Sequence, residues 1–241
     1  MDMPIDMQHQ AMGYDRTATM FSPEGSLLQV EYAEKAVRRG SSSIGMVCSD
    51  GVFIIADKGM KNKLIVPKSS NKIYEIDAHI ITSIAGIISD ARVLIERSQI
   101  VSQQHRITYD SAIEPELIIK EISNIKQQFT QYGGARPFGV ALMIAGVNRN
   151  DAELFTSDIT GNYFSYFANA IGENDERIKE ILKEKYKQDL TIKKGVKLAL
   201  DIFKEIQKDI FDMSRFELVY INTKEKKLNR VEHQELKEFI K

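Results

Sequence analysis

Pairs of strand-like segments alternate with pairs of helix-like segments along this chain, and this order limits the folds open to it. Residues 43–57, SIGMVCSDGVFIIAD, predict a β-hairpin around Asp50-Gly51, and residues 73–86 predict a second antiparallel pair. Paired hairpins followed by paired helices indicate an α+β layered architecture rather than a doubly wound parallel sheet, in which single strands and single helices alternate. Helices are further expected at 88–105, 114–132, 174–186 and about 191–211, and strands at 138–147, 153–158 and 162–172. Two strand-like segments, 216–223 and 228–232, and a last short helix are expected to complete the chain.

The bulk properties exclude several classes of function. The 241 residues include 33 basic and 34 acidic side chains, so no strong field would attract nucleic acid or acidic membranes. The longest apolar runs are about half of what a bilayer requires. A single cysteine, Cys48, and the lack of a signal peptide favour a cytoplasmic protein, and the lack of a linker favours one domain.

Cofactor chemistry has little support in the sequence. The four histidines lack the spacing of metal ligands, so we expect no metal site. No phosphate-binding glycine loop or nucleophile elbow occurs, so we expect no cofactor and no nucleotide chemistry in this chain.

A short amphipathic helix is expected at about 26–38, before most of the hydrophobic pattern. Ser26 and Gln29 fit a capping box, in which each side chain would bond a backbone N–H at the helix start. Gly40 is placed to end the helix. Its apolar side could pack on the chain's own sheet or on a neighbouring copy, and the spacing alone leaves both open.

Three separated motifs carry a resemblance to a known family. The stretch YDRTATMFSPEGSLLQVEYAEKAVRRG (14–40) resembles the N-terminal hallmark of proteasome α subunits. DARVLI (90–95) and TQYGGARPFG (130–139) resemble two further family blocks, and TQYGGARPFG is most similar to the sequence of archaeal members. The three motifs fall in the family's order, and together with the order of strands and helices the resemblance covers about residues 13–240.

The resemblance implies a four-layer αββα sandwich of the N-terminal-nucleophile hydrolase type, with two antiparallel sheets between helix layers. It implies a non-catalytic α subunit in a heptameric ring of one or several α types, capping a ring of proteolytic β subunits. The ring would gate unfolded protein substrates and bind an ATPase or other activator through C-terminal tails. The helix at 26–38 would lie on the outer surface of the ring, and residues 1–13 would form a flexible gate ahead of a single domain at 14–241.

The same resemblance assigns residues to roles. The pocket for an activator's tail would contain Lys72, Gly40 and Ile87. The cluster that holds the gate open would be Tyr14, Asp15, Pro23 and Tyr32. The pore loop would be Tyr132, Gly133, Gly134, Ala135 and Arg136, although a Gly-Gly pair is also an ordinary helix stop.

Two alternatives stay open. Ser41, Asp57 and Lys72 resemble the nucleophile, acid and lysine of the catalytic β subunits, so a self-processed hydrolase using Ser41 is a rival. A free-standing ring without β partners is another. Ser26 and Glu34 stand where many relatives have basic residues, and the change at Glu34 puts neighbour contacts and activator preference in question.

Overall fold

Two antiparallel sheets form the centre of the protein. The computed structural model describes residues 12–59, 64–149, 151–231 and 233–239. Within these ranges each sheet has five strands, and every pairing is antiparallel. The first sheet has the order β10 (Leu228–Val231), β9 (Phe216–Asn222), β2 (Gly51–Asp57), β1 (Ser43–Cys48) and β8 (Ala168–Ile171). The second has the order β3 (Ile73–Asp77), β4 (Ile80–Gly86), β5 (Val140–Asn148), β6 (Asp151–Ser157) and β7 (Tyr163–Ser165).

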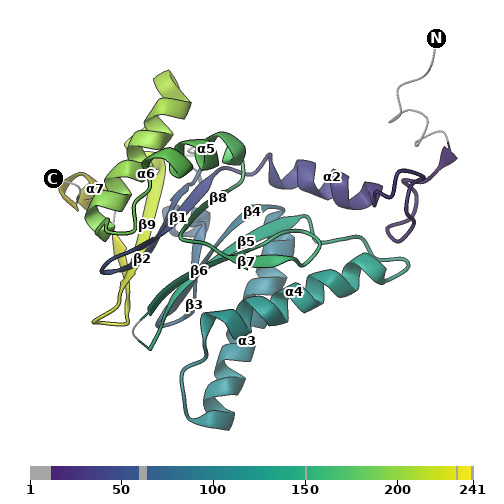
Figure 1. Ribbon diagram of the computed structural model, residues 1–241, viewed down its shortest axis with the longest axis horizontal. Coiled ribbons are helices and arrows are strands. Elements are labelled where there is room, and N and C mark those ends of the chain that lie inside the picture. Colours follow the sequence, from purple (N-terminus) through teal and green to yellow (C-terminus); the bar gives the residue numbers. More distant parts are fainter. Residues whose placement is uncertain (1–11, 60–63, 150, 232, 240–241) are drawn as a thin grey trace.

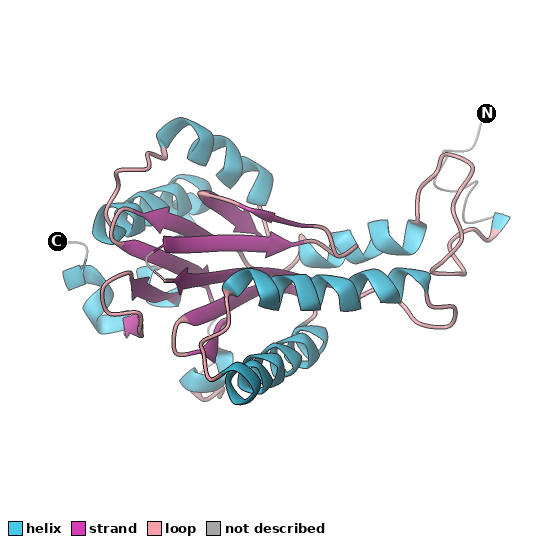
Figure 2. Cartoon of the chain, turned by 60° about the horizontal axis from the view of Figure 1, so that its bottom comes forward, coloured by secondary structure: helices cyan, strands magenta, loops and turns pink. Residues whose placement is uncertain are grey.

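Helices cover the outer face of each sheet (Figures 1 and 2). Helices α3 (Ile88–Tyr109) and α4 (Pro115–Gln131) pack on the second sheet through one apolar cluster. Helices α5 (Asp175–Lys185), α6 (Ile192–Gln207) and α7 (His233–Phe239) contact the first sheet or pack at its edge. Short 3₁₀ turns lie at Pro67–Ser70, Lys208–Ile210 and Met213–Arg215. The four-layer α+β sandwich implied by the resemblance is confirmed, and no helix in the described ranges is long and apolar enough to cross a bilayer.

Strand β2 shows why the sheets stack. Its seven residues are all buried, because each face meets a different layer. Val52, Ile54 and Ala56 belong to the cluster between the two sheets. Phe53 and Ile55 point the other way, into the cluster under α5 and α6. Alternating side chains of a strand take opposite faces, so an unbroken apolar run is what a central strand of a sandwich requires.

The first hairpin forms as predicted, with a small difference in its turn. The register pairs Cys48 with Gly51, so Ser49 and Asp50 make the two-residue loop and Gly51 opens β2. A methyl group on Gly51 would lie 2.1 Å from the carbonyl oxygen of Ile221 on β9, which explains the glycine. The Asp50 carboxylate accepts a 2.7 Å bond from the backbone N–H of Ile192 and so caps α6.

The strand predicted at 162–172 is two strands in different sheets. β7 pairs with β6 in the second sheet, and β8 pairs with β1 in the first. The Tyr166 N–H donates to the Leu154 carbonyl of β6, in the second sheet. The carbonyl of the following residue, Phe167, accepts from the Val47 N–H of β1, in the first sheet. The chain therefore crosses between the sheets within one residue, a step that composition does not reveal.

Helix α2 (Leu28–Val37) lies within the predicted span, but its predicted capping box is wrong. Leu27 is the N-cap residue, and no side chain caps the helix. The Gln29 amide instead donates a 2.5 Å bond to the carbonyl of Asp15, which fixes the preceding segment on the helix. The helix extends beyond one end of the sandwich (Figure 1), with Leu28 and Val30 buried and Val37 packed against the cluster between the sheets.

Helix α4 buries a lysine against the second sheet. Ile118 and Ile122 lie on its core side, and Lys126 on the same side is also fully buried. Its ammonium group donates to the carbonyls of Ser157 (3.3 Å) and Asp158 (2.9 Å) and to the Ser157 hydroxyl (3.2 Å). Burial lowers the pKa of Lys126 to about 7, against the raising effect of the Asp158 carboxylate.

Candidate functional site

A cavity of about 400 Å³ lies between α2 and the end of β4. Its lining includes Tyr32, Lys35, Arg39, Gly40, Gly86 and Ile87. The predicted pocket residues Gly40 and Ile87 therefore face a common space. A methyl group on Gly40 would lie 2.5 Å from the backbone nitrogen of Gly86, so only glycine lets the chain after α2 approach the end of β4 this closely.

The cavity has a basic lining. Lys35 and Arg39 both line it, and neither makes an ion pair with an acid in the described part of the chain. The Lys35 ammonium lies 5.3 Å from the centre of the Tyr32 ring, a cation–π distance. An opening with two cations and an aromatic wall suits a carboxylate attached to an apolar or aromatic group.

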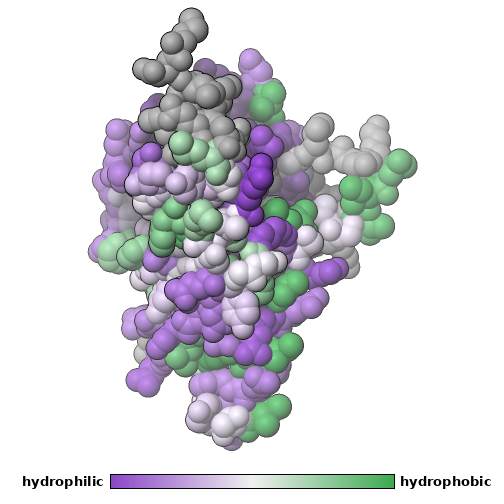
Figure 3. All heavy atoms as spheres, turned by 90° about the vertical axis from the view of Figure 1, so that its right-hand side faces the viewer, coloured by the Kyte–Doolittle hydropathy of each residue, from purple (hydrophilic) through white to green (hydrophobic). Residues whose placement is uncertain are grey.

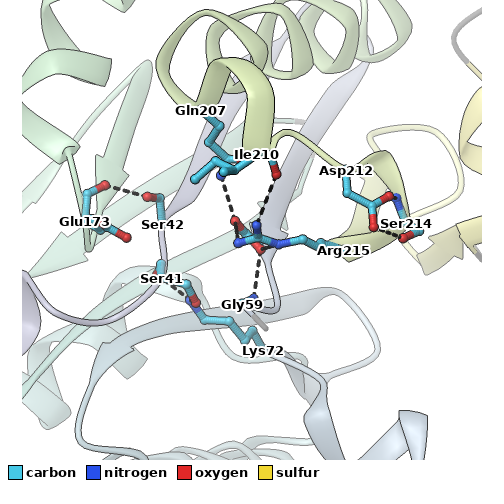
Figure 4. A network of polar contacts seen from close by, with 11 residues as sticks. Ser41, Ser42, Gly59, Lys72, Glu173, Gln207, Ile210, Asp212, Ser214 and Arg215 are labelled. Atoms are coloured by element: carbon cyan, nitrogen blue, oxygen red, sulfur yellow. Dashed lines mark hydrogen bonds and ion pairs between the residues drawn. The ribbon is translucent and has the colours of Figure 1, made fainter. Parts of the chain in front are cut away.

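Lys72 lies directly behind the wall of this cavity rather than in its lining. Its ammonium group donates to the carbonyl (2.5 Å) and hydroxyl (2.8 Å) of Ser41, the residue after Gly40 (Figure 4). Burial lowers the pKa of Lys72 to about 8, and the nearby Asp57 carboxylate opposes this shift. The backbone N–H of Lys72 donates to Glu217 of β9, which holds the start of β3 against the other sheet.

The Asp57 carboxylate is engaged by other groups. Arg215 donates two bonds to it, of 3.1 and 2.6 Å, and the Gln207 amide donates a third of 2.7 Å (Figure 4). The backbone N–H of Gly59 donates a fourth, of 2.8 Å. The structure thus brings Ser41 and Lys72 into contact, whereas Asp57 is tied to the end of α6 and the turn before β9.

The amide nitrogen of Ser41 is in a peptide bond, and the chain around it is firmly held. The Gly40 carbonyl accepts a 2.7 Å bond from the N–H of Glu173. The Ser42 hydroxyl donates a 2.5 Å bond to the Glu173 carbonyl. Helix α2 precedes this segment, so in the intact chain Ser41 has no free amine to act as its base.

The predicted gate residues lie along the approach to α2. Asp15 is bound to the helix through Gln29, and Tyr14 beside it is half-buried. Pro23 is exposed in a turn closed by the 2.8 Å bond from Gly25 to Ser22. Tyr32 lies on α2 and lines the cavity. Of the proposed gate segment at 1–13, residues 1–11 lie outside the described part of the chain.

The predicted pore loop is anchored by a contact that the sequence did not indicate. Tyr132 is 67% exposed, and Gly134 takes a left-handed backbone with φ of +87°. Arg136 binds both oxygens of Asp90, at 2.6 and 2.7 Å, and the N–H of Gly139 adds a 2.9 Å bond. The bonds from Arg136 hold the pKa of Asp90 below its usual range, against the effect of burial. Asp90 is the first residue of the DARVLI motif, which is where a sequence signal for this contact resides.

The two departures from the family pattern have different surroundings. The backbone N–H of Ser26 bonds to the Ser22 hydroxyl, so Ser26 belongs to the turn before α2. Glu34 lines a second cavity of about 240 Å³ together with Arg38 and Lys179. The face shown in Figure 3 is largely hydrophilic, with separate apolar groups between the polar ones. In the described ranges no three His, Cys, Asp or Glu side chains are grouped to hold a metal.

Known proteins match this chain over most of its length. The family model described as "Proteasome subunit" matches residues 37–221, and the model for the N-terminal signature of the α-type members matches residues 14–36. A protein of Methanocaldococcus jannaschii named as a proteasome alpha subunit is 41% identical over 94% of this chain and 87% of its own. One of the same name from Pyrobaculum aerophilum is 43% identical over 93% and 92%, respectively. A third, from Methanococcus maripaludis strain C5, is 48% identical over 79% and 73%.

Proposed function

Because the chain belongs to the proteasome α-subunit family, we propose that it forms the outer heptameric ring of a core particle in the cytoplasm. In this role the ring admits unfolded protein, docks an activator and leaves peptide hydrolysis to β subunits. The observation that carries the proposal is the cavity lined by α2 and the end of β4, with the continuous Gly40-Ser41 backbone at its wall.

The cavity between α2 and the end of β4 is suited to the C-terminal tail of an activator, and we term it the docking cavity. A tail ends in a carboxylate, and Lys35, Arg39 and the ammonium of Lys72 lie around or just behind the lining. Lys72 can reach a carboxylate if its side chain exchanges the two Ser41 oxygens for the incoming ones. Burial lowers the pKa of Lys72, and the carboxylate of a bound tail would raise it again by favouring the charged ammonium.

Gating is assigned to the segment before α2 and to the loop at 132–136. The Gln29 bond to Asp15 couples the end of the N-terminal segment to α2, which also lines the docking cavity. The exposed Tyr132 and the two glycines after it give a loop with little side-chain bulk. Such a loop suits a narrow opening for an unfolded chain.

One contact favours the second candidate, a hydrolase that uses Ser41. The Lys72 ammonium lies 2.8 Å from the Ser41 hydroxyl, and its lowered pKa of about 8 would suit a base. Against it, the amine of Ser41 is acylated by Gly40, and the Asp57 carboxylate is bound by Arg215 and Gln207. The hydrolase therefore requires removal of residues 1–40, and with them α2.

Co-expression with a proteasome β subunit tests both candidates. We expect a ring-sized α particle that carries β subunits, and an intact denatured mass for this chain that lacks at most the initiator methionine. A mass short of residues 1–40 would expose Ser41 as an N-terminal nucleophile and make the chain an enzyme. Rings without any β subunit would favour the free-standing ring instead.

A further inference from the structure

Behind the wall of the docking cavity, three segments of the chain converge on one buried carboxylate. Asp57, at the end of β2, is 2% exposed and accepts four hydrogen bonds (Figure 4). Two come from Arg215 before β9, one from the Gln207 amide at the end of α6, and one from the Gly59 N–H. Because an apolar side chain at this position would need no donors, the charge itself is the feature to explain.

The end of α6 bears two energetic costs where it meets this carboxylate. Lys208, directly after Gln207, has φ of +48° and ψ of −116°, a backbone conformation that side chains rarely adopt. The side-chain oxygen of Gln207 is buried, and no group among the described residues donates to it. Strain and unsatisfied polar atoms persist where a function or the surrounding structure requires them. Here both lie on the residues that bring the Gln207 amide to Asp57.

The backbone after β2 connects Asp57 to the wall of the docking cavity. Because the Gly59 N–H donates to the Asp57 carboxylate, the chain turns back on itself, with Gly59 in the left-handed region at φ of +76°. The Ser41 hydroxyl oxygen lies 3.9 Å from where a methyl group on Gly59 would be, so this turn backs directly on Ser41. The Asp57 N–H also donates a 2.9 Å bond to the Ser42 carbonyl. Asp57 is therefore tied to the segment whose Ser41 oxygens hold the Lys72 ammonium.

The Asp57 charge also acts on the Lys72 ammonium through space. Burial lowers the pKa of Lys72, the Asp57 carboxylate raises it, and the balance is a pKa of about 8. Four other charged side chains are tied to this group by hydrogen bonds or ion pairs: Lys58 through Asn71, Arg215 through Asp57, Glu217 through the backbone N–H of Lys72, and Arg230 through Glu217. Asp57 thus supports the charged form of Lys72 from behind the cavity wall.

We propose that Asp57 is a positioning residue for activator docking: it holds the turn after β2 against Ser41 and keeps Lys72 a cation that can bind the terminal carboxylate of a tail. The inference rests on the proposed function, and it adds a residue that regulates the docking cavity without lining it. Ser41, Asp57 and Lys72, which resemble a catalytic set, serve binding in the intact chain.

This role makes docking depend on pH. A tail carboxylate binds the charged ammonium of Lys72 and holds it charged to a higher pH than in the free ring. The affinity for the tail therefore falls as pH rises through the pKa of free Lys72, about 8. Removing the Asp57 charge lowers that pKa, so the fall moves to lower pH.

The test measures the affinity of rings of the full chain for a short fluorescent peptide that ends in an aromatic residue and a free carboxylate. We expect the wild-type dissociation constant to rise roughly tenfold per pH unit above about pH 8. The same peptide with a C-terminal amide should show no such rise. In Asp57→Asn the rise should begin about one pH unit lower. Asp209→Asn is the matched control, because Asp209 is an exposed acid in the 3₁₀ turn after α6.

Two further variants keep the test informative. Asp57→Asn leaves the Arg215 guanidinium without its partner, so Asp57→Asn combined with Arg215→Gln is made beside it, and native mass must report rings for either. The double variant should shift the rise in the same direction. Lys72→Arg keeps its charge at every pH tested, so its affinity should not change with pH, which separates Lys72 from Lys35 in the lining.

The outcomes separate this inference from the proposed function. A wild-type ring that binds the peptide at no pH would refute docking, and this inference with it. Binding that does not change with pH, or that changes equally for the amide peptide, would leave docking intact and show that the charge of Lys72 is not used. A rise at the same pH in wild type and in Asp57→Asn would remove Asp57 from this role. An equal shift in Asp209→Asn would assign the effect to net charge instead.

Discussion

Replacing the buried Lys126 by methionine is expected to remove a pH dependence from the stability of this protein. Lys126 is fully buried between α4 and β6, and its nearest acceptors are two carbonyls and one hydroxyl. Burial lowers its pKa to about 7 from the ordinary 10.5. Between these values the folded protein gives up a proton that the unfolded chain still holds.

The sign and size follow from this difference in bound protons. The unfolded state binds more protons in the window from about pH 7 to 10.5, so the free energy of unfolding rises with pH across it. Below this window both states hold the proton, and burying the charged ammonium lowers the free energy of unfolding by its full amount. Above the window neither state holds the proton. From pH 7 to 9 the two titration curves give a gain of about 2 kcal/mol for wild type, and methionine at this position gives none.

The assay is urea unfolding at pH 7, 8 and 9, followed by far-UV circular dichroism at one protein concentration. Other groups also titrate, so the informative quantity is the wild-type free energy of unfolding minus that of Lys126→Met. Lys120→Met is the control, because Lys120 lies on the exposed side of the same helix. Parallel pH curves for wild type and Lys126→Met would refute the reasoning. They would mean that the carbonyls of Ser157 and Asp158 stabilise a charged ammonium as well as water does.

Two further predictions concern the docking cavity. Gly86→Ala should cost at least about 3 kcal/mol in urea unfolding, because φ is +117° and its methyl group would lie 2.2 Å from the Gly139 carbonyl oxygen. Gly134→Ala should cost only about 1 kcal/mol, since φ is +87° but no atom lies within 4 Å, and equal losses would contradict this account. Lys72→Ala should abolish stimulation of peptide hydrolysis by an activator's tail peptide while native mass still reports rings; unchanged stimulation would remove Lys72 from docking.

The sequence predicted the layers of this fold well, because they depend on local patterns. The hairpin at 43–57 and the helix at 114–132 were found from turn dipeptides and apolar spacing, and both exist with boundaries close to those expected. The step from β7 to β8 was missed, since a strand that changes sheets has the same composition as one that does not. Which sheet each part of this segment joins depends on which distant strands offer it hydrogen bonds.

Contacts between distant residues explain the other errors. Ser26 and Gln29 fit a capping box, yet Gln29 bonds to Asp15, because a carbonyl from the preceding segment is within its reach. Lys126 lies on the helical face that carries the buried isoleucines, where a charged residue is rarely expected. It is accommodated there because carbonyls at the end of β6 accept its hydrogen bonds. For the candidate site, the sequence supplied Gly40, Ile87 and Lys72, but not Lys35, whose place in the cavity depends on how α2 is rotated.

Between the docking cavity and the loop at 132–136, glycines allow backbone to pack directly on backbone, without side chains between them. Gly40 meets the backbone of Gly86, Gly86 meets that of Gly139, and the Ile87 N–H donates a 2.9 Å bond to the Gly139 carbonyl. Arg136 then fastens the loop to Asp90 in the first turn of α3. Flexible side chains can absorb a displacement by changing rotamer, but backbone in contact with backbone cannot. We therefore expect a displacement of the cavity wall to be passed on to the base of the loop at 132–136.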